Sequence, residues 1–118
     1  MTQSQEDYLE MVSFLSDEGE VRVTDIAARL GFSKPSVSAA IKLLEERNLI
    51  QHQRYRSVSL TQKGQELAET IRERHTLITK FLQDKLGVSA DTAEKDACKM
   101  EHILSEETLD RMKLSVQS

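Results

Sequence analysis

The sequence predicts a mainly α-helical protein in which a winged helix-turn-helix domain precedes a helical domain. Apolar residues recur at helical spacing through most of the 118 residues, and only one Pro and four Gly interrupt them. Residues 23–44 read as two short helices around a Gly turn. Two short segments of alternating character follow at 49–53 and 57–60 and predict a β-hairpin. Together these patterns predict a winged helix, for which a small helical core with an irrelevant hairpin is the alternative.

Charge is unevenly distributed along the chain, whose net charge is −4. Residues 1–20 carry six acidic side chains and no Lys or Arg, whereas residues 21–60 carry seven basic and three acidic ones. Residues 61–118 carry nine basic and eleven acidic side chains. The basic middle segment could face DNA phosphates and the acidic ends could hold cations, although ordinary charge scatter is the alternative.

The N-terminal segment, the apolar runs and the cysteine content of the sequence predict a cytoplasmic protein. The acidic N-terminal segment does not resemble a signal peptide, and no apolar run approaches the length of a membrane span. The single Cys excludes an intrachain disulfide and fits a reducing compartment.

The predicted DNA-reading helix begins after Ser33, its expected N-cap, and follows a helix for which Thr24 is the expected cap. Small polar side chains on its outward face would let it approach a surface closely, and two Arg lie at the tip of the hairpin. The candidate DNA-binding residues on these two elements are Lys34, Ser36, Ser38, Lys42, Arg54 and Arg56.

The C-terminal half predicts a long helix from Thr61 to about Leu86, another from Ser89 to residue 103 or 104, and a short last one after Ser105. These helices carry more apolar side chains than one small lobe needs, so we expect a homodimer that binds a palindromic operator. We expect a DNA-binding domain at 1–72 and a dimerisation and metal-binding domain at 73–118. Candidate interface residues are Phe81, Leu109 and Met112.

A candidate metal site lies near the end of the expected helix from Ser89. Cys98, Glu101 and His102 are spaced i, i+3 and i+4, which places a thiol, a carboxylate and an imidazole on one helix face. All three are metal-ligand types. Taken singly, each has an ordinary explanation: a solvated surface carboxylate, a structural His or a buried Cys that acts as a small hydrophobe. The full candidate ligand set is Asp7, Glu10, His75, Cys98, Glu101 and His102.

The charge of this set suits two divalent metals per subunit. Asp7, Glu10, Glu101 and a Cys98 thiolate carry four negative charges, which two divalent cations would cancel. Without metal, gathering these anions costs free energy; with metal, they become cross-links between the first helix and the C-terminal domain. Oxygen-rich ligation favours Mn(II) or Fe(II), and the thiolate adds softness.

Five sequence segments resemble the metal-dependent repressors of the diphtheria-toxin-repressor type, especially their manganese transport regulator branch. The resemblance covers essentially the whole chain and implies a homodimeric winged-helix repressor that binds operator DNA when loaded with a divalent metal. The matching segments are E-D-Y-L-E (6–10), the helix-turn-helix and wing (23–60), L-T-Q-K-G (60–64), R-H-T-L (74–77) and D-A-C-K-M-E-H-I-L-S (96–105).

The resemblance also implies roles for the ligands. Asp7 and Glu10 match carboxylates of the manganese branch, and His75, Glu101 and His102 match ligands of both branches. One position departs from each branch. Cys98 departs from the manganese branch, which has Glu there, and matches the iron branch. Thr79 departs from the iron branch, which has at this position a Glu that belongs to a second, ancillary metal site. We also expect no SH3-like third domain of the kind that longer family members have.

Two other classes of protein remain as alternatives. A metal-independent, MarR-like winged-helix regulator of a small organic ligand would leave the ligand-type residues without a common purpose. An enzyme is conceivable, because clustered carboxylates and His in helices also build di-metal catalysts. No nucleophile motif accompanies them, however, and the winged helix would be unexplained. We therefore expect a non-enzymatic regulator.

Overall fold

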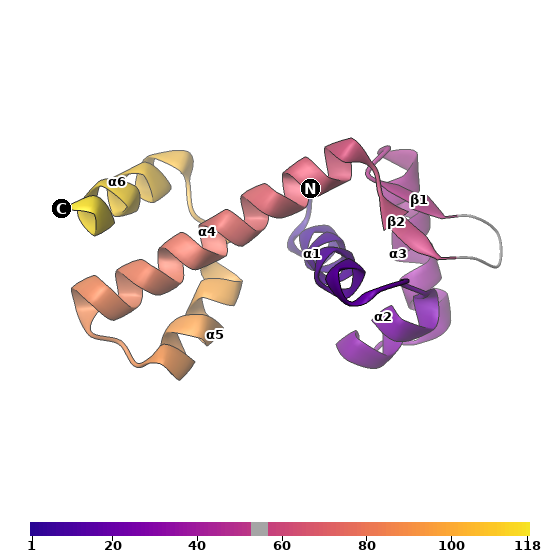
Figure 1. Cartoon of the computed structure of the whole chain (residues 1–118), viewed down its shortest axis with the longest axis horizontal. Coiled ribbons are helices and arrows are strands. Elements are labelled where there is room, and N and C mark those ends of the chain that lie inside the picture. The colour runs from indigo at the N-terminus through magenta and orange to yellow at the C-terminus, as the bar shows by residue number, and fades with distance from the viewer. Residues whose placement is uncertain (53–56) are drawn as a thin grey trace. The chain divides into compact units, whose positions relative to one another are not determined.

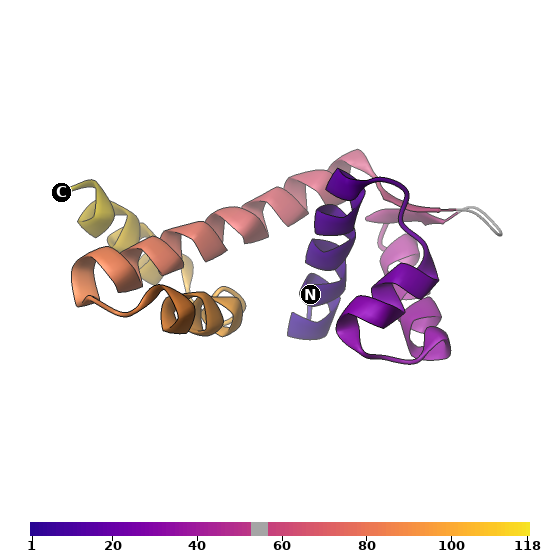
Figure 2. The same cartoon turned by 60° about the horizontal axis from the view of Figure 1, so that its bottom comes forward.

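The computed structural model describes residues 1–52 and 57–118, which form two compact units (Figures 1 and 2). The first unit is Met1–Glu69 and the second is Thr70–Ser118. The elements are α1 (Gln3–Glu18), α2 (Val23–Leu30), α3 (Lys34–Glu46), β1 (Ile50–His52), β2 (Val58–Leu60), α4 (Gln62–Leu86), α5 (Ala90–Met100) and α6 (Glu106–Gln117). The mainly helical fold class is confirmed, and the domain boundary expected after residue 72 remains a prediction.

Side-chain caps define where the helices of the first unit begin. The Thr2 hydroxyl accepts a hydrogen bond from the Gln5 backbone N–H at 3.2 Å, and the Ser33 hydroxyl accepts one from the Ser36 N–H, as predicted. Thr24 is not the cap of α2. The N-cap is Arg22, two residues earlier, where the Asp25 carboxylate accepts a hydrogen bond from the Arg22 backbone N–H at 2.9 Å.

The helix-turn-helix of α2 and α3 depends on a glycine. Gly31 ends α2 with φ 72°, a left-handed conformation in which most L-residues are strained. The turn lets α3 pack its apolar stripe inward: Val37, Ile41 and Leu44 have no exposed surface. The polar side of α3 therefore remains in solvent.

The hairpin of β1 and β2 is antiparallel, with Ile50 opposite Leu60 and His52 opposite Val58. A third segment joins it: Val21 forms an isolated bridge to Val58, whose N–H donates to the Val21 carbonyl at 2.7 Å. This bridge ties the loop before α2 to the wing and was not predicted. The expected wing-tip contacts, Arg54 and Arg56, lie outside the described residues.

The wing is fixed to the start of α4 through Thr61. The Thr61 hydroxyl donates to the Asn48 carbonyl at 2.7 Å and accepts from the Gly64 N–H at 3.0 Å, which confirms Thr61 as the cap. Gly64 is buried against Leu49, whose carbonyl oxygen accepts from the Thr61 N–H at 3.1 Å. Any side chain at position 64 would collide with that carbonyl group.

In the second unit, α5 and α6 pack along the second half of α4 (Figure 1). Its core is formed by apolar residues from all three helices: Ile78, Leu82, Ala93, Ala97, Leu109 and Met112. Two residues predicted at a dimer interface, Leu109 and Met112, thus already fill this core, and Phe81 packs against it. Whether they also contact a second copy remains a prediction.

The end of α5 differs from the prediction. The helix stops at Met100, and Glu101 to Ile103 form a turn before the Ser105 cap of α6. The expectation of a helix to residue 103 or 104 was therefore wrong. In the described part of the chain, no helix is both long and apolar enough to cross a membrane.

Candidate metal centre and DNA-reading helix

His75, in the middle of α4, is the junction of the candidate metal centre. Its Nδ1 lies 2.8 Å from Glu101 Oε2 and its Nε2 lies 2.9 Å from Glu94 Oε1. The imidazole is 17% exposed, so one ring edge faces the protein interior and the other reaches the surface. The two ring nitrogens therefore serve two different carboxylates.

Glu101 is the buried charged residue of this unit. Its side chain has no exposed surface, and its Oε1 lies 3.3 Å from Nε2 of His102, which is itself 1% exposed. A carboxylate buried this deeply is costly unless cations or hydrogen-bond donors surround it. The turn after α5 places Glu101 and His102 inward, and two imidazoles flank the carboxylate.

Cys98 on α5 completes an outer group with Glu94 of the same helix and His75 of α4. The donor atoms of His75, Glu94 and Cys98 all lie within 4.8 Å of one another, and Glu94 and Cys98 are exposed. Glu94 was missed by the sequence reasoning. It precedes Cys98 by four residues, so the same i, i+4 helical spacing that joined Cys98 to His102 could have found it.

The structure thus groups four of the predicted ligands. Glu101, with His102 beside it, lies at Nδ1 of His75, and Cys98 belongs to the outer group with Glu94, whose carboxylate lies at Nε2. The other two predicted ligands, Asp7 and Glu10, lie on α1 in the first unit, and both are partly buried. That Asp7 and Glu10 bind metal stays a prediction.

The donor set suits a divalent transition metal. Carboxylate oxygen, imidazole nitrogen and thiolate sulfur are the ligand types that proteins use for Mn, Fe and Zn ions. A ligating His typically donates its other ring N–H to a carboxylate. His75 has this arrangement, because Glu101 stands at its second nitrogen. These residues therefore fit the divalent transition metal that the sequence predicts.

The outward face of α3 carries the predicted DNA contacts of the first unit. Lys34, Ser36, Ser38 and Lys42 are all exposed, opposite the buried stripe of the helix. The Ser36 hydroxyl accepts a hydrogen bond from Ser33 at 2.9 Å and so belongs partly to the cap. Two apolar side chains beside this face were not predicted: Phe32 is 52% and Leu43 is 49% exposed.

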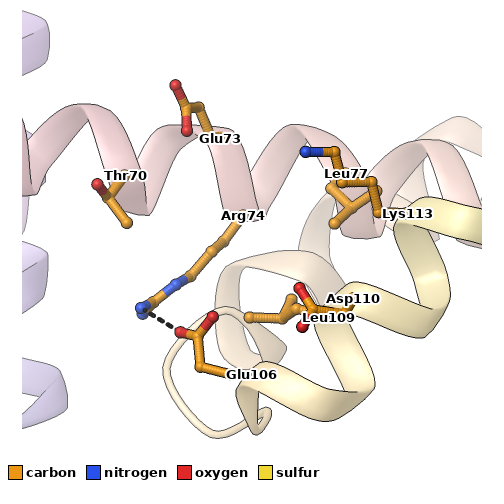
Figure 3. A pocket seen from close by; sticks show the side chains of 8 residues that line it. All are labelled: Thr70, Glu73, Arg74, Leu77, Glu106, Leu109, Asp110 and Lys113. Carbon is orange, nitrogen blue, oxygen red and sulfur yellow. Dashed lines mark hydrogen bonds and ion pairs between the residues drawn. The ribbon is translucent and has the colours of Figure 1, made fainter.

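A pocket of about 460 Å³ lies between α4 and α6, away from the ligand-type residues (Figure 3). Leu77 and Leu109 contribute its apolar part, and an ion pair between Arg74 and Glu106 at 3.2 Å crosses it. The remaining lining residues include both acidic and basic side chains. None of the candidate metal ligands lines this pocket.

The chain belongs to the iron-dependent repressor family, whose members are metal-dependent transcriptional regulators. Residues 1–58 match the family's N-terminal DNA-binding domain, and residues 61–118 match its metal-binding and dimerisation domain. The resemblance seen in the sequence is confirmed, and the metal-independent alternative is not supported.

Two relatives illustrate the match. The transcriptional regulator MntR of Escherichia coli O6:H1 is 47% identical over 113 residues, which cover 95% of this chain and 72% of that protein. An HTH-type transcriptional regulator of Methanocaldococcus jannaschii is 35% identical over 119 residues, covering 99% of this chain and 95% of the relative. These relatives are transcriptional regulators rather than enzymes by name.

Solved structures share the fold. The manganese regulator SloR superposes with a TM-score of 0.83 at 31% identity, covering 99% of this chain and 55% of that one. A manganese-dependent transcriptional repressor in complex with manganese gives a TM-score of 0.86 at 28% identity, covering 96% and 52%. The chain therefore spans about half the length of these two solved chains.

Proposed function

We propose that this protein is a cytoplasmic, non-enzymatic repressor that binds a palindromic operator as a homodimer when loaded with Mn(II) or Fe(II). Its targets would be genes of metal-ion homeostasis. The observation that carries the proposal is the cluster around His75, which joins a buried carboxylate to N, O and S donors in a chain that also has a winged helix.

Metal would act by cross-linking the two units. The proposed ligands are Asp7 and Glu10 from α1 and the second unit's His75, Cys98, Glu101 and His102, which could hold up to two ions per subunit. A bound divalent ion supplies positive charge that offsets these carboxylates and the thiolate. Shifting a two-state equilibrium from 1:99 to 99:1 takes about 5.5 kcal/mol of differential binding. Two ions with several ligands each are a reasonable source of that difference.

The DNA side of the proposal rests on α3. Its exposed serines are small enough to let the helix backbone come close to the major groove, while Lys34 and Lys42 can reach phosphates. The tip residues Arg54 and Arg56 are proposed as additional backbone contacts from the wing.

Replacing Lys42 with Ala should weaken operator binding and flatten its salt dependence. Each phosphate contact contributes roughly 0.9 to the slope of log K against log salt concentration, so the slope should fall by about one unit. Fluorescence anisotropy with a labelled operator at several salt concentrations measures this. Lys63→Ala, an exposed lysine on α4, is the matched control. An unchanged slope for Lys42→Ala would remove this side chain from the phosphate contacts.

A further inference from the structure

We infer that Tyr8 and Phe32 are positioning residues that transmit metal binding on α1 to the start of the DNA-reading helix α3. The inference rests on the proposed function, because it takes Asp7 and Glu10 as metal ligands. It adds a contact between two aromatic side chains that belong neither to the proposed ligands nor to the proposed DNA contacts. Both side chains lie within the first unit.

Tyr8 belongs to the part of α1 that carries the proposed ligands. It follows Asp7 directly and precedes Glu10 by two residues within one continuous helix. Tyr8 is 5% exposed, whereas Asp7 and Glu10 are only partly buried. A helical backbone holds neighbouring residues in a fixed relation to one another. A metal ion that restrains the two carboxylates therefore also restrains the buried Tyr8 ring.

Phe32 joins this ring to the start of α3. Its ring centroid lies 6.1 Å from that of Tyr8 and the ring planes are tilted by 48°, which is within the range of attractive aromatic pairs. Phe32 immediately precedes Ser33, the N-cap of α3, whose hydroxyl accepts a hydrogen bond from the Ser36 N–H. The Phe32 N–H donates to the Ala27 carbonyl at 3.2 Å. Phe32 is thus held between the end of α2 and the cap of α3, with its ring against α1.

The exposure of Phe32 favours this role over simple core packing. The residue is 52% exposed, so its ring adds little to the buried core of the unit. The first turn of α3, directly after it, carries Lys34 and Ser36, two of the proposed DNA contacts. A shift of Phe32 would therefore displace first the residues that approach DNA.

Replacing Phe32 with Leu tests the contact, because Leu is apolar but lacks the ring, and the exposed position should tolerate it. The quantity measured is the ratio of operator affinity in manganese to operator affinity in chelator, from the anisotropy of a labelled operator. This ratio should fall by roughly 2- to 30-fold, the range over which residues between coupled sites change the coupling. Phe32→Tyr keeps the ring, so it is the matched control and should retain the wild-type ratio.

Hydrogen exchange followed by mass spectrometry gives a second readout that does not involve DNA. In wild type and in Phe32→Tyr, manganese should slow amide exchange in a peptide from the start of α3, residues 33–40. In Phe32→Leu, manganese should still slow exchange in a peptide from α1 but no longer in residues 33–40. This pattern would separate loss of transmission from loss of metal binding.

Two outcomes would overturn the inference. One is a Phe32→Leu protein whose affinity ratio and α3 exchange match those of wild type. The other is an equal loss of operator affinity in manganese and in chelator, which would make Phe32 a direct DNA contact. Failure of the proposed function would instead appear in the wild-type protein, as equal operator affinity with and without metal, and would overturn both.

Discussion

Replacing Glu101 with Gln should raise the manganese concentration needed for operator binding by about 10- to 100-fold or more. A change in a carboxylate that only orients a ligating His typically costs this much metal affinity, and loss of a direct ligand costs more. The Glu101 side chain is fully buried. Its Oε2 lies 2.8 Å from His75 Nδ1 and its Oε1 lies 3.3 Å from His102 Nε2, so its charge acts on both imidazoles. Gln keeps the size of the side chain and removes only the charge.

The measurement is anisotropy of a labelled operator, selected from random DNA by the metal-loaded protein, during titration with manganese. Glu107→Gln removes an exposed carboxylate on α6 and serves as the control. A thermal melt of each apo protein separates loss of metal binding from loss of fold. A wild-type manganese midpoint in Glu101→Gln would contradict the assigned role of this residue.

Replacing Gly64 with Ala should destabilise the first unit by about 3 kcal/mol or more, at or above the upper end of ordinary overpacking. A Cβ at this position would overlap the Leu49 carbonyl oxygen and lie 3.0 Å from its carbonyl carbon. That carbonyl cannot easily retreat, because it accepts the hydrogen bond from Thr61 N–H that fixes the wing to α4.

The expected destabilisation is opposite in sign to the usual effect, because Gly→Ala in a helix normally stabilises the folded protein by about 0.5–1 kcal/mol. Urea unfolding monitored by circular dichroism gives the change in the free energy of unfolding. Lys63→Ala, one residue away and exposed, should stay within about 0.5 kcal/mol of wild type. A stabilised Gly64→Ala protein would show that the close approach to Leu49 does not exist.

Local signals predicted most helix boundaries of this chain. Ser33, Thr61, Ser89 and Ser105 all cap helices where the sequence indicated, because a hydroxyl before an apolar periodic segment satisfies orphan N–H groups. The prediction failed at Thr24, because the Asp25 carboxylate accepts a hydrogen bond from the Arg22 backbone N–H and the N-cap of α2 is therefore two residues further back.

Long-range packing was less accessible from the sequence. Phe14 has helical spacing with the buried stripe of α1 yet is 46% exposed, because residue 15 rather than 14 faces the core. The sequence did not show that Leu109 and Met112 pack with Ala93 and Ala97 in the core of the second unit. Their contact with a second copy of the chain stays a prediction.

For the candidate metal centre, the ligand types were predictable and their grouping was not. Helical spacing in the sequence singled out Cys98 and Glu101 as candidates on one face. The structure instead places Glu101 at Nδ1 of His75 and groups Cys98 with Glu94, whose carboxylate lies at Nε2. Helical spacing can pair Glu94 with Cys98, but only the three-dimensional packing of α4 against α5 shows that both lie close to His75.

The most direct test of the account is operator affinity of the wild-type protein with Mn(II) or Fe(II), compared with the same protein in chelator. Metal that is thermodynamically coupled to DNA binding should tighten the complex by roughly 5- to 150-fold, corresponding to about 1–3 kcal/mol of coupling. By reciprocity, operator DNA should tighten metal binding by the same factor. Equal operator affinity in metal and in chelator would contradict the central claim that the cluster around His75 controls DNA binding.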